Sequence, residues 1–386
     1  MYIDLQMSYE VASTIDLYTH NVKDKSVLKS SEYISYTDSR KELEKYKSSW
    51  NSQYERKFPK NHFGEHGIPT SIDILDSLWI EVVNYSEPLS VQNFHKLFKK
   101  ITVIGSEVRL VEITPVILDF IYNFMKDEKK KIYENLVKKG CLLIPLDLVL
   151  PCSMLPYTEK IIRIETNVEY NLYGKCTILD NEERRKMVTT KEMKVCYNAY
   201  DSKIQGITNL SSWMTDLRFR GHTKELMFAI RDKDTHEYIP NLIDSTSLVY
   251  EQTERCKLNS LQSSVINPSM YKDTIGSYEI HLISYGSNDA CHTDFSQLNN
   301  IALYYNLNSK EVFKYFLRKL VMVGLTSKNL FEKELMSSGL LIDIFNFSNE
   351  RYEVQDTEKN LELCVVQVKN NLCVFTRGSI LFPYLL

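Results

Sequence analysis

The chain has 386 residues, and its 47 Lys and Arg against 50 Asp and Glu give a formal net charge of −3 at pH 7. Hydrophobic residues make up 43% and charged residues 25%, which is a globular composition and excludes a disordered chain. The near-neutral balance excludes capture of nucleic acid by an overall basic surface, although it leaves room for a local basic patch. No direct, sequence-specific binding of nucleic acid is therefore expected.

Length and aromatic content together favour a β-rich protein. At roughly 150 residues per domain, the length corresponds to two or three domains or to one large all-β unit. The 25 Tyr and 16 Phe suit pleated, half-buried surfaces, whereas only 12 Gly and 10 Pro are present for turns. Many loops must therefore use Asn, Asp and Ser.

The cysteines and the N-terminus indicate a reducing compartment. The eight Cys lie far apart and form no Cys-x-x-Cys pair, which argues against a zinc ribbon and a thioredoxin-like site. Cys141 and Cys364 precede apolar runs and are expected to be small buried hydrophobes. The first residues lack a basic region followed by an apolar one, so no secretory signal is expected.

Residues 140–158 have the length and apolarity of a membrane span. However, Pro145, Pro151 and Pro156 would each remove a helical hydrogen bond, and Asp147 lies near the centre of the segment. Extended strands broken by turns are predicted here instead.

The first half of the chain combines an N-terminal arm with strand patterns. Residues 1–50 are polar and carry only a short helical candidate at 39–50, so we expect an arm without a core of its own. Strand alternation follows at residues 71–85, with a slip near Asp76 and Ser77, and then at 101–106, 142–150 and 160–170.

One long helix and one inward strand face are predicted within this half. Thr114 suits an N-cap, Pro115 the first turn and Gly140 the C-terminal stop, which predicts a helix through Lys139. Along the strand at 160–170, the side chains expected to be buried are those of Ile162, Ile164 and Val168.

The second half is also rich in strand patterns. A charged helix is expected at 180–194 and a connection at 199–212, and strands are expected at 217–231, 277–285, 301–307 and 361–375. Leu226, Phe228 and Ile230 should face the core of this half. Between the last two strands lies a helical insertion at about 309–345, capped by Ser309, with one apolar face formed by Val312, Phe313, Phe316, Leu317 and Leu320.

Catalytic motifs are absent from the sequence. It contains no phosphate-binding Gly-x-x-x-x-Gly-Lys-Ser/Thr loop, no Gly-x-Gly-x-x-Gly and no Gly-x-Ser-x-Gly. His62 and His66 have the i,i+4 spacing of helical metal ligands, but the glycines and proline around them predict a loop. His281 and His292 flank a strand without a His-x-His pair, and the charged run 126–131 is typical of a solvated helix face. We therefore expect no enzyme, no catalytic, cofactor-binding or metal-binding residues, and no cofactor.

Several segments nevertheless resemble, in collinear order, the double jelly-roll major capsid proteins of nucleocytoplasmic large DNA viruses. Residues 101–108 (ITVIGSEV) are similar to the family's IGGQEID turn, with Ser106 in place of its second glycine. Residues 179–187 (LDNEERRKM) follow the family's LDTDERRRF, and 219–230 (FRGHTKELMFAI) its FNHPVKELIWVI, with Thr223 in place of the proline. Further matching segments are 76–82, 143–146 with 155–164, 276–282, 293–301 and 366–372.

The resemblance implies a mainly all-β chain with two consecutive jelly-roll β-sandwiches and a few inserted helices. The domains expected are an arm at 1–50, a first jelly roll at 51–198 and a second at 199–386, with the helical insertion inside it. The chain is short for the family, so its loops must be trimmed and it would be a divergent member.

The resemblance also implies a structural role as the major capsid protein of an icosahedral shell, in the virion, after assembly in the host cytoplasm. Its main partner would be itself, as a homotrimer of pseudo-hexagonal outline and then through capsomer–capsomer contacts. Minor capsid or penton proteins and an underlying viral membrane would be further partners. Two alternatives remain at this point: a capsid-like scaffold that shapes a viral membrane during assembly, and a jelly-roll module that binds glycans.

Overall fold

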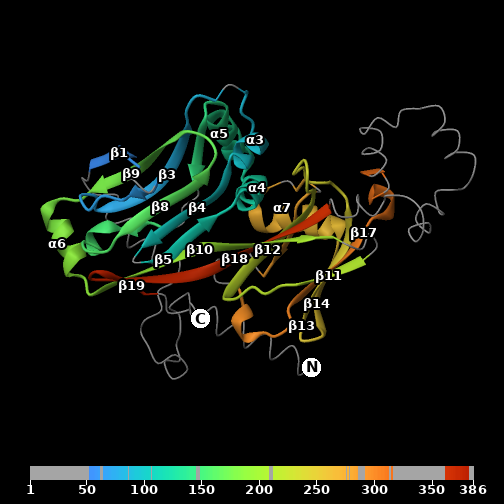
Figure 1. Ribbon diagram of the computed structural model, residues 1–386. Helices are drawn as coiled ribbons and strands as arrows, with labels where there is room; N and C mark the ends of the chain where they lie inside the picture. The colour runs from blue at the N-terminus through green and yellow to red at the C-terminus, as the bar shows by residue number, and fades with distance from the viewer. Residues whose placement is uncertain are drawn as a thin grey trace, which may run out of the picture.

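The computed structural model describes residues 52–60, 64–85, 87–105, 107–144, 148–207, 212–274, 276–277, 279–285, 292–312, 314–315 and 361–381. The predicted arm at 1–50 with its helix at 39–50, and the insertion from residue 316 onwards, lie outside the described residues. The described part is mainly β-structure arranged in two adjacent units (Figure 1).

The first unit contains strands β1 to β9 and helices α3 to α6. Its strands are β1 (Ser52–Phe58), β2 (His66–Gly67), β3 (Ile74–Val82), β4 (Phe98–Gly105), β5 (Val108–Ile113), β6 (Cys141–Ile144), β7 (Leu150–Pro151), β8 (Lys160–Thr166) and β9 (Tyr170–Ile178). Its helices are α3 (Val91–Lys96), α4 (Pro115–Asn123), α5 (Asp127–Lys138), η1 (Cys152–Met154) and α6 (Asn181–Thr189).

The second unit contains strands β10 to β19. Its strands are β10 (Glu192–Gly206), β11 (Ser212–Asp216), β12 (His222–Asp232), β13 (Ile243–Tyr250), β14 (Thr253–Asn259), β15 (His281–Ser284), β16 (Thr293–Asp294), β17 (Ala302–Leu307), β18 (Leu361–Thr376) and β19 (Ser379–Leu381). Its helices are η2 (Gln262–Ile266), α7 (Asn267–Lys272) and η3 (Phe295–Gln297).

Both units have the same antiparallel strand order. In the first, one sheet runs β1-β9-β3-β6 and the other β2-β8-β4-β5. In the second, the sheets run β10-β18-β12-β15 and β11-β17-β13-β14. When the eight main strands of each unit are numbered along the chain, both units read 1-8-3-6 and 2-7-4-5, which is the strand order of a jelly roll.

The strand patterns seen in the first half of the sequence are confirmed. Ile162 and Ile164 of β8 are buried, whereas the alternate residues Arg163 and Glu165 are exposed, because this sheet has one face in the core and one in solvent. Val168 is only half-buried, because β8 ends at Thr166 and Val168 lies in the turn that follows.

The slip predicted near Asp76 and Ser77 is a β-bulge in the pairing of β3 with β9, between Leu75 and Ser77. The segment 140–158 contains β6, β7 and the turn η1, as extended structure broken by turns predicts. No helix of the described chain is long and apolar enough to cross a membrane.

The long helix predicted from Thr114 to Lys139 is two helices. α4 starts at Pro115 after Thr114, as expected, but it ends at Asn123. α5 begins at Asp127 and is followed by Gly140, whose φ of +79° is the left-handed conformation that stops a helix. The separation lets both helices bury their apolar faces, including Phe120 of α4 and Val137 of α5.

The connection predicted at 199–212 is wrong over most of its length. β10 runs to Gly206 and pairs with β18 without a break from Glu192 onwards, so the boundary drawn between residues 198 and 199 falls inside this strand. We propose Glu192 as the start of the second jelly roll.

The central strands β12 and β18 of the sheet β10-β18-β12-β15 are buried on both faces. Leu226, Phe228 and Ile230 of β12 are buried in the core of the second jelly roll, as predicted. The alternate residues Met227 and Ala229 belong to the core of the first unit. The two units therefore share a packed interface, and the larger core extends from the first jelly roll onto the second.

Candidate functional site

Of the two histidines with i,i+4 spacing, the structure describes His66, whose two ring nitrogens both contact protein groups. His62 lies outside the described residues. His66 is buried, its Nδ1 donates to the Phe58 carbonyl at 2.6 Å, and its Nε2 lies 3.1 Å from the Tyr170 hydroxyl. Burial lowers the pKa of His66 and so favours the neutral ring, whose Nε2 can accept a hydrogen bond from the Tyr170 hydroxyl.

His281 is occupied by structural contacts, and the charged run at 126–131 forms a largely solvated helix face. The Nδ1 of His281 lies 2.8 Å from the Ser263 hydroxyl, its ring stacks on Phe228, and burial lowers its pKa to about 4. The charged run begins α5, and most of its side chains are exposed.

Across the residues that the structure describes, no group of three or more His, Cys, Asp or Glu is placed to hold a metal ion. That the chain has no catalytic, cofactor or metal residue stays a prediction. It would be contradicted by a stoichiometric metal in the purified protein.

A polar cleft lies where β5 and α4 of the first jelly roll meet β10, β18 and the start of β12. This interbarrel cleft has a volume of about 520 Å³. It is lined by Arg109, Glu112, Ile117, Tyr200, Asp201, Ser202, Lys203, Arg218, Phe219, Arg220, Gly221, His222, Lys369, Asn370 and Asn371.

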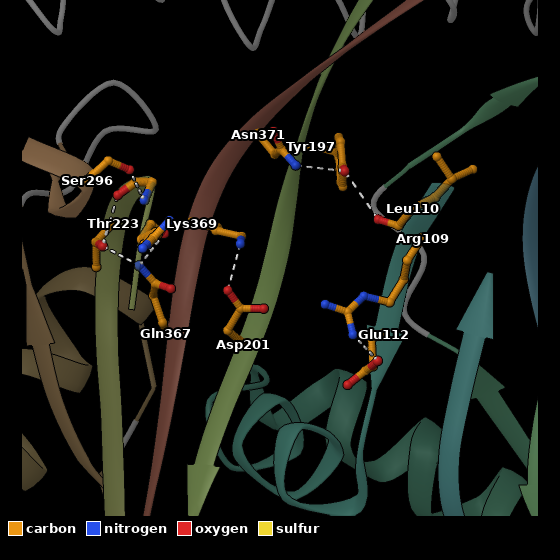
Figure 2. Close-up of polar contacts among 12 residues, drawn as sticks. Arg109, Leu110, Glu112, Tyr197, Asp201, Thr223, Ser296, Gln367, Lys369 and Asn371 are labelled. Carbon is orange, nitrogen blue, oxygen red and sulfur yellow. Dashed lines mark hydrogen bonds and ion pairs between the residues drawn. The ribbon is translucent and has the colours of Figure 1, made fainter. Parts of the chain in front are cut away.

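A hydrogen-bond relay beside the cleft connects the two jelly rolls (Figure 2). The Asn371 amide of β18 donates to the Tyr197 hydroxyl of β10 at 2.9 Å, and that hydroxyl donates to the Leu110 carbonyl of β5 at 3.2 Å. Tyr197 is buried, and burial raises the pKa of its hydroxyl, which stays protonated and able to donate. The relay fixes β5 against β10 and so fixes the two sides of the cleft.

Ion pairs occupy both carboxylates of the cleft. Glu112 accepts from Arg109 at 2.5 Å, and Asp201 pairs with Lys369 at 2.6 Å (Figure 2). Glu112 also accepts from Lys100 at 2.9 Å. Burial would raise the pKa of Glu112, but its two cationic partners outweigh burial and hold that pKa below the ordinary value. Glu112 is therefore ionised at pH 7, and both carboxylates already have cationic partners.

The segment that precedes β12 brings further cations to the cleft. Arg218 donates to the Asp216 carboxylate at 3.1 Å, and the Lys203 ammonium donates to the Asp216 backbone carbonyl. Among the described residues, Arg220 forms no ion pair, and its carbonyl accepts from the buried Gln367 amide at 3.1 Å. The segment is thus held through the backbone of Arg220, a residue that is exposed and lines the cleft.

His222 also lines the cleft, next to these cations. Its ring lies 4.8 Å from the ring of His292, in an edge-to-face arrangement. Burial lowers the pKa of His222, an effect that the Asp294 carboxylate opposes only in part. The imidazole is therefore mostly neutral at pH 7 and adds little to the charge of the cleft.

No sequence motif predicted the cleft. Its cations are spread from Arg109 to Lys369 and come together only when the two jelly rolls pack. The nearest local signal was the alternation of Arg218 and Arg220 around the buried Phe219, which is what a half-buried segment with one cationic side produces.

No protein-family model and no curated protein matches the chain. Solved structures of virus capsid proteins do match it. VP54 of PBCV-1, fitted into a reconstruction of the virophage Sputnik, matches with a TM-score of 0.65 at 11% identity, over 86% of this chain and 97% of that chain. A chain of the PBCV-1 virus capsid gives a TM-score of 0.63 at 11% identity and the same coverage.

The major capsid protein of Faustovirus matches with a TM-score of 0.56 at 7% identity, over 98% of each chain. The chain has the double jelly-roll fold of these capsid proteins. The match covers nearly the whole length of each capsid chain, so it includes both jelly rolls and their arrangement side by side. The double jelly-roll fold predicted from the collinear segments is confirmed.

Proposed function

We propose that this double jelly-roll chain is a major capsid protein that builds an icosahedral virus shell. The observation that carries the proposal is the identical strand order of two adjacent jelly rolls, arranged as in capsid chains that the match covers over 97–98% of their length. A jelly roll places its loops at its ends, so upright jelly rolls can tile a surface side by side. The role is structural and non-enzymatic.

The chain would assemble as a homotrimer. Three chains with two similar lobes each give six lobes, hence a homotrimer of pseudo-hexagonal outline that can tile a flat facet. The shared core supports this geometry, because it holds the two jelly rolls of one chain in a fixed relation. The trimers would assemble in the host cytoplasm and reside in the virion, in contact with minor capsid or penton proteins and an underlying membrane.

One exposed apolar surface suits a contact between chains. On the helical segment formed by η2 and α7, Leu261, Ile266 and Met270 are 49%, 39% and 63% exposed. Large apolar side chains gathered on one exposed segment are typical of protein–protein contacts, and obligate interfaces bury more than about 2,000 Å² around an apolar centre. We therefore place η2 and α7 in the trimer interface.

The proposal is tested by the mass and shape of the purified protein. Light scattering after size exclusion should give three times the chain mass of 45.2 kDa, and electron microscopy should show pseudo-hexagonal particles or sheets. Met270→Glu should shift the protein towards monomer. The matched control is Ile132→Glu on α5, at a side chain of almost equal exposure (62%) that has no exposed apolar neighbours on its helix, and it should leave the trimer intact.

Two outcomes would count against the proposal at different levels. A trimer that persists in Met270→Glu would exclude α7 from the interface. A stable monomer at every salt and protein concentration would contradict the capsid function itself.

A further inference from the structure

The charge of the interbarrel cleft is unbalanced. Five of its lining residues are cationic, namely Arg109, Lys203, Arg218, Arg220 and Lys369, whereas only Glu112 and Asp201 are acidic. These cations come from β5, β10, β18 and the segment before β12, so the imbalance is not a run of charges on one surface element. The interbarrel cleft therefore carries an excess of positive charge, although the whole chain has a net charge of −3.

The carboxylates present cannot neutralise this excess. Glu112 already forms ion pairs with Arg109 and Lys100, and Asp201 forms one with Lys369. Asp216, outside the lining, accepts from Arg218 through its side chain and from Lys203 through its backbone. Arg220 lines the cleft and has no ion pair among the described residues. Positive charges confined in a concave site repel one another unless an anion joins them.

We propose that the interbarrel cleft binds a compact, multivalent phosphate. Guanidinium groups form forked, bidentate hydrogen bonds to phosphate oxygens, and the lining holds three of them together with two ammonium groups. The Ser202 hydroxyl and the Asn370 side chain in the lining add neutral polar groups suited to the remaining oxygens. A volume of about 520 Å³ lies in the usual range of small-molecule sites.

The position of the cleft suggests what this anion does. Arg109 comes from the first jelly roll, whereas Lys203, Arg220 and Lys369 come from the second, so a bound phosphate joins the two. Because the ligand binds the docked, native arrangement, it stabilises the folded chain by mass action. This inference does not depend on the capsid proposal, since a monomer would bind the anion equally well.

The test uses the full chain with pyrophosphate and inositol hexakisphosphate as probes, followed by calorimetric titration and thermal unfolding. Both probes should bind with an affinity that falls as salt rises, and both should raise the melting temperature. Arg220→Gln should weaken binding by about tenfold or more, because it removes a charge-assisted contact. The fold should tolerate this substitution, since the recorded hydrogen bond of Arg220 uses its backbone carbonyl.

The matched control is Arg185→Gln, which removes one positive charge from the exposed side of α6, away from the cleft. It should bind both probes like the unaltered chain. Equal affinities of the Arg220→Gln variant and the unaltered chain would overturn the proposal, as would an equal loss in both variants.

Further binding experiments distinguish a lipid headgroup from a free phosphate as the ligand. Vesicles of phosphatidylcholine carrying a phosphatidylinositol phosphate test a lipid headgroup, and pure phosphatidylcholine vesicles are their control. Arg220-dependent binding to the charged vesicles would assign the cleft to a headgroup, and binding of the soluble probes alone would assign it to a free phosphate. Tighter binding of a single-stranded oligonucleotide than of either probe would overturn the assignment to a compact anion.

Discussion

At the scale of single residues, Asp73 illustrates how buried charge holds the first jelly roll together. Its carboxylate accepts from Arg184 Nε at 2.8 Å and Nη2 at 2.6 Å, from the Ser153 hydroxyl at 2.7 Å and from the Leu179 backbone N–H at 2.7 Å. These donors tie the residue before β3 to η1 and α6. Burial raises the pKa of Asp73, but the hydrogen bonds, that of Arg184 first, outweigh burial and lower the pKa overall.

This arrangement predicts a specific dependence of stability on pH. A carboxyl whose folded-state pKa is depressed stabilises the fold above its unfolded pKa of about 3.9, and that contribution is lost as the pH falls through the folded pKa. Asp73→Asn should therefore lower the free energy of unfolding at pH 7 by about 1.5–3 kcal/mol, and its difference from the unaltered chain should shrink in acid. Denaturant titrations at a series of pH values measure this difference.

The matched control for Asp73 is Glu182→Gln on the exposed side of α6. The Glu182 carboxylate is 79% exposed, and its one ion pair among the described residues is with Lys186, so its removal should change stability little. A constant difference between Asp73→Asn and the unaltered chain from neutral to strongly acidic pH would show that the carboxylate charge is not what stabilises this contact.

Gly174 of β9 lies where the neighbouring side chains leave no room for a Cβ atom. A Cβ atom there would lie 2.6 Å from the Phe58 ring and 2.9 Å from Leu75 Cδ1. Gly174→Ala should therefore destabilise the chain by about 1–3 kcal/mol through overpacking. Gly206→Ala at the end of β10 is the control, because no atom lies within 4 Å of its Cβ position, and it should be neutral or slightly stabilising.

Thermal unfolding of both glycine variants measures the difference. The double variant Phe58→Leu with Gly174→Ala should recover part of the loss, since the smaller side chain makes room. Equal melting temperatures for the two single variants would contradict the close packing over Gly174.

At the scale of elements, the sequence predicted best those strands that have one face in solvent. β8 alternates apolar Ile162 and Ile164 with charged Arg163 and Glu165, so its pattern shows both faces. The run at 361–375 also predicted β18, although this strand is buried on both faces and its apolar residues do not alternate strictly with polar ones. Periodicity predicted the strands but not how they are arranged. The arrangement in two jelly rolls was predicted from the collinear motif segments.

The elements that the sequence did not predict depend on contacts between distant segments. Residues 200–203 of β10 are polar because they line the interbarrel cleft, so this part of a long strand resembled a connection. The break between α4 and α5 has no proline or glycine to indicate it and follows from the packing of each helix. The cleft itself arises only when the two jelly rolls meet.

The last strands show how strongly one jelly roll depends on the other. β18 continues past the second core, and β19 follows it beneath the first jelly roll (Figure 1). The Gly378 backbone N–H donates to the Met154 carbonyl at 2.9 Å, and the Thr158 hydroxyl donates to the Gly378 carbonyl at 2.7 Å. Phe375 and Ile380 are buried in the first core. The C-terminal strands therefore complete the first jelly roll.

A substitution in β18 should consequently destabilise the first jelly roll. Phe375→Ala removes a fully buried ring and should cost about 3–5 kcal/mol of unfolding free energy. Leu381→Ala in β19 is the control, because Leu381 is 54% exposed, and its effect should stay within about 0.5 kcal/mol. Proteolysis of the native chain should show faster cleavage within residues 52–190 for Phe375→Ala only. Unchanged cleavage there would contradict the proposed dependence.

At the scale of the whole molecule, the two jelly rolls have separate apolar cores that lie on opposite faces of one sheet. The sheet β10-β18-β12-β15 presents Leu363 and Val365 to the second core and Val366 and Val368 to the first. If the units separated, the outer face of this sheet would be exposed to water, at a cost of roughly 25 cal/mol for each Å² of apolar surface. The two jelly rolls are therefore coupled through a sheet that belongs to both cores.

This coupling predicts that the chain unfolds as a single cooperative unit. A calorimetric scan should show one transition, with the calorimetric enthalpy equal to the van't Hoff enthalpy. Val365→Ala and Val366→Ala form a matched pair, because the two fully buried valines are adjacent in β18 but face different cores. Each should lower stability by about 2 kcal/mol and move the whole transition, since neither core can unfold alone. Two transitions, of which Val365→Ala moves only one, would show instead that the jelly rolls unfold independently and that the shared sheet does not couple them.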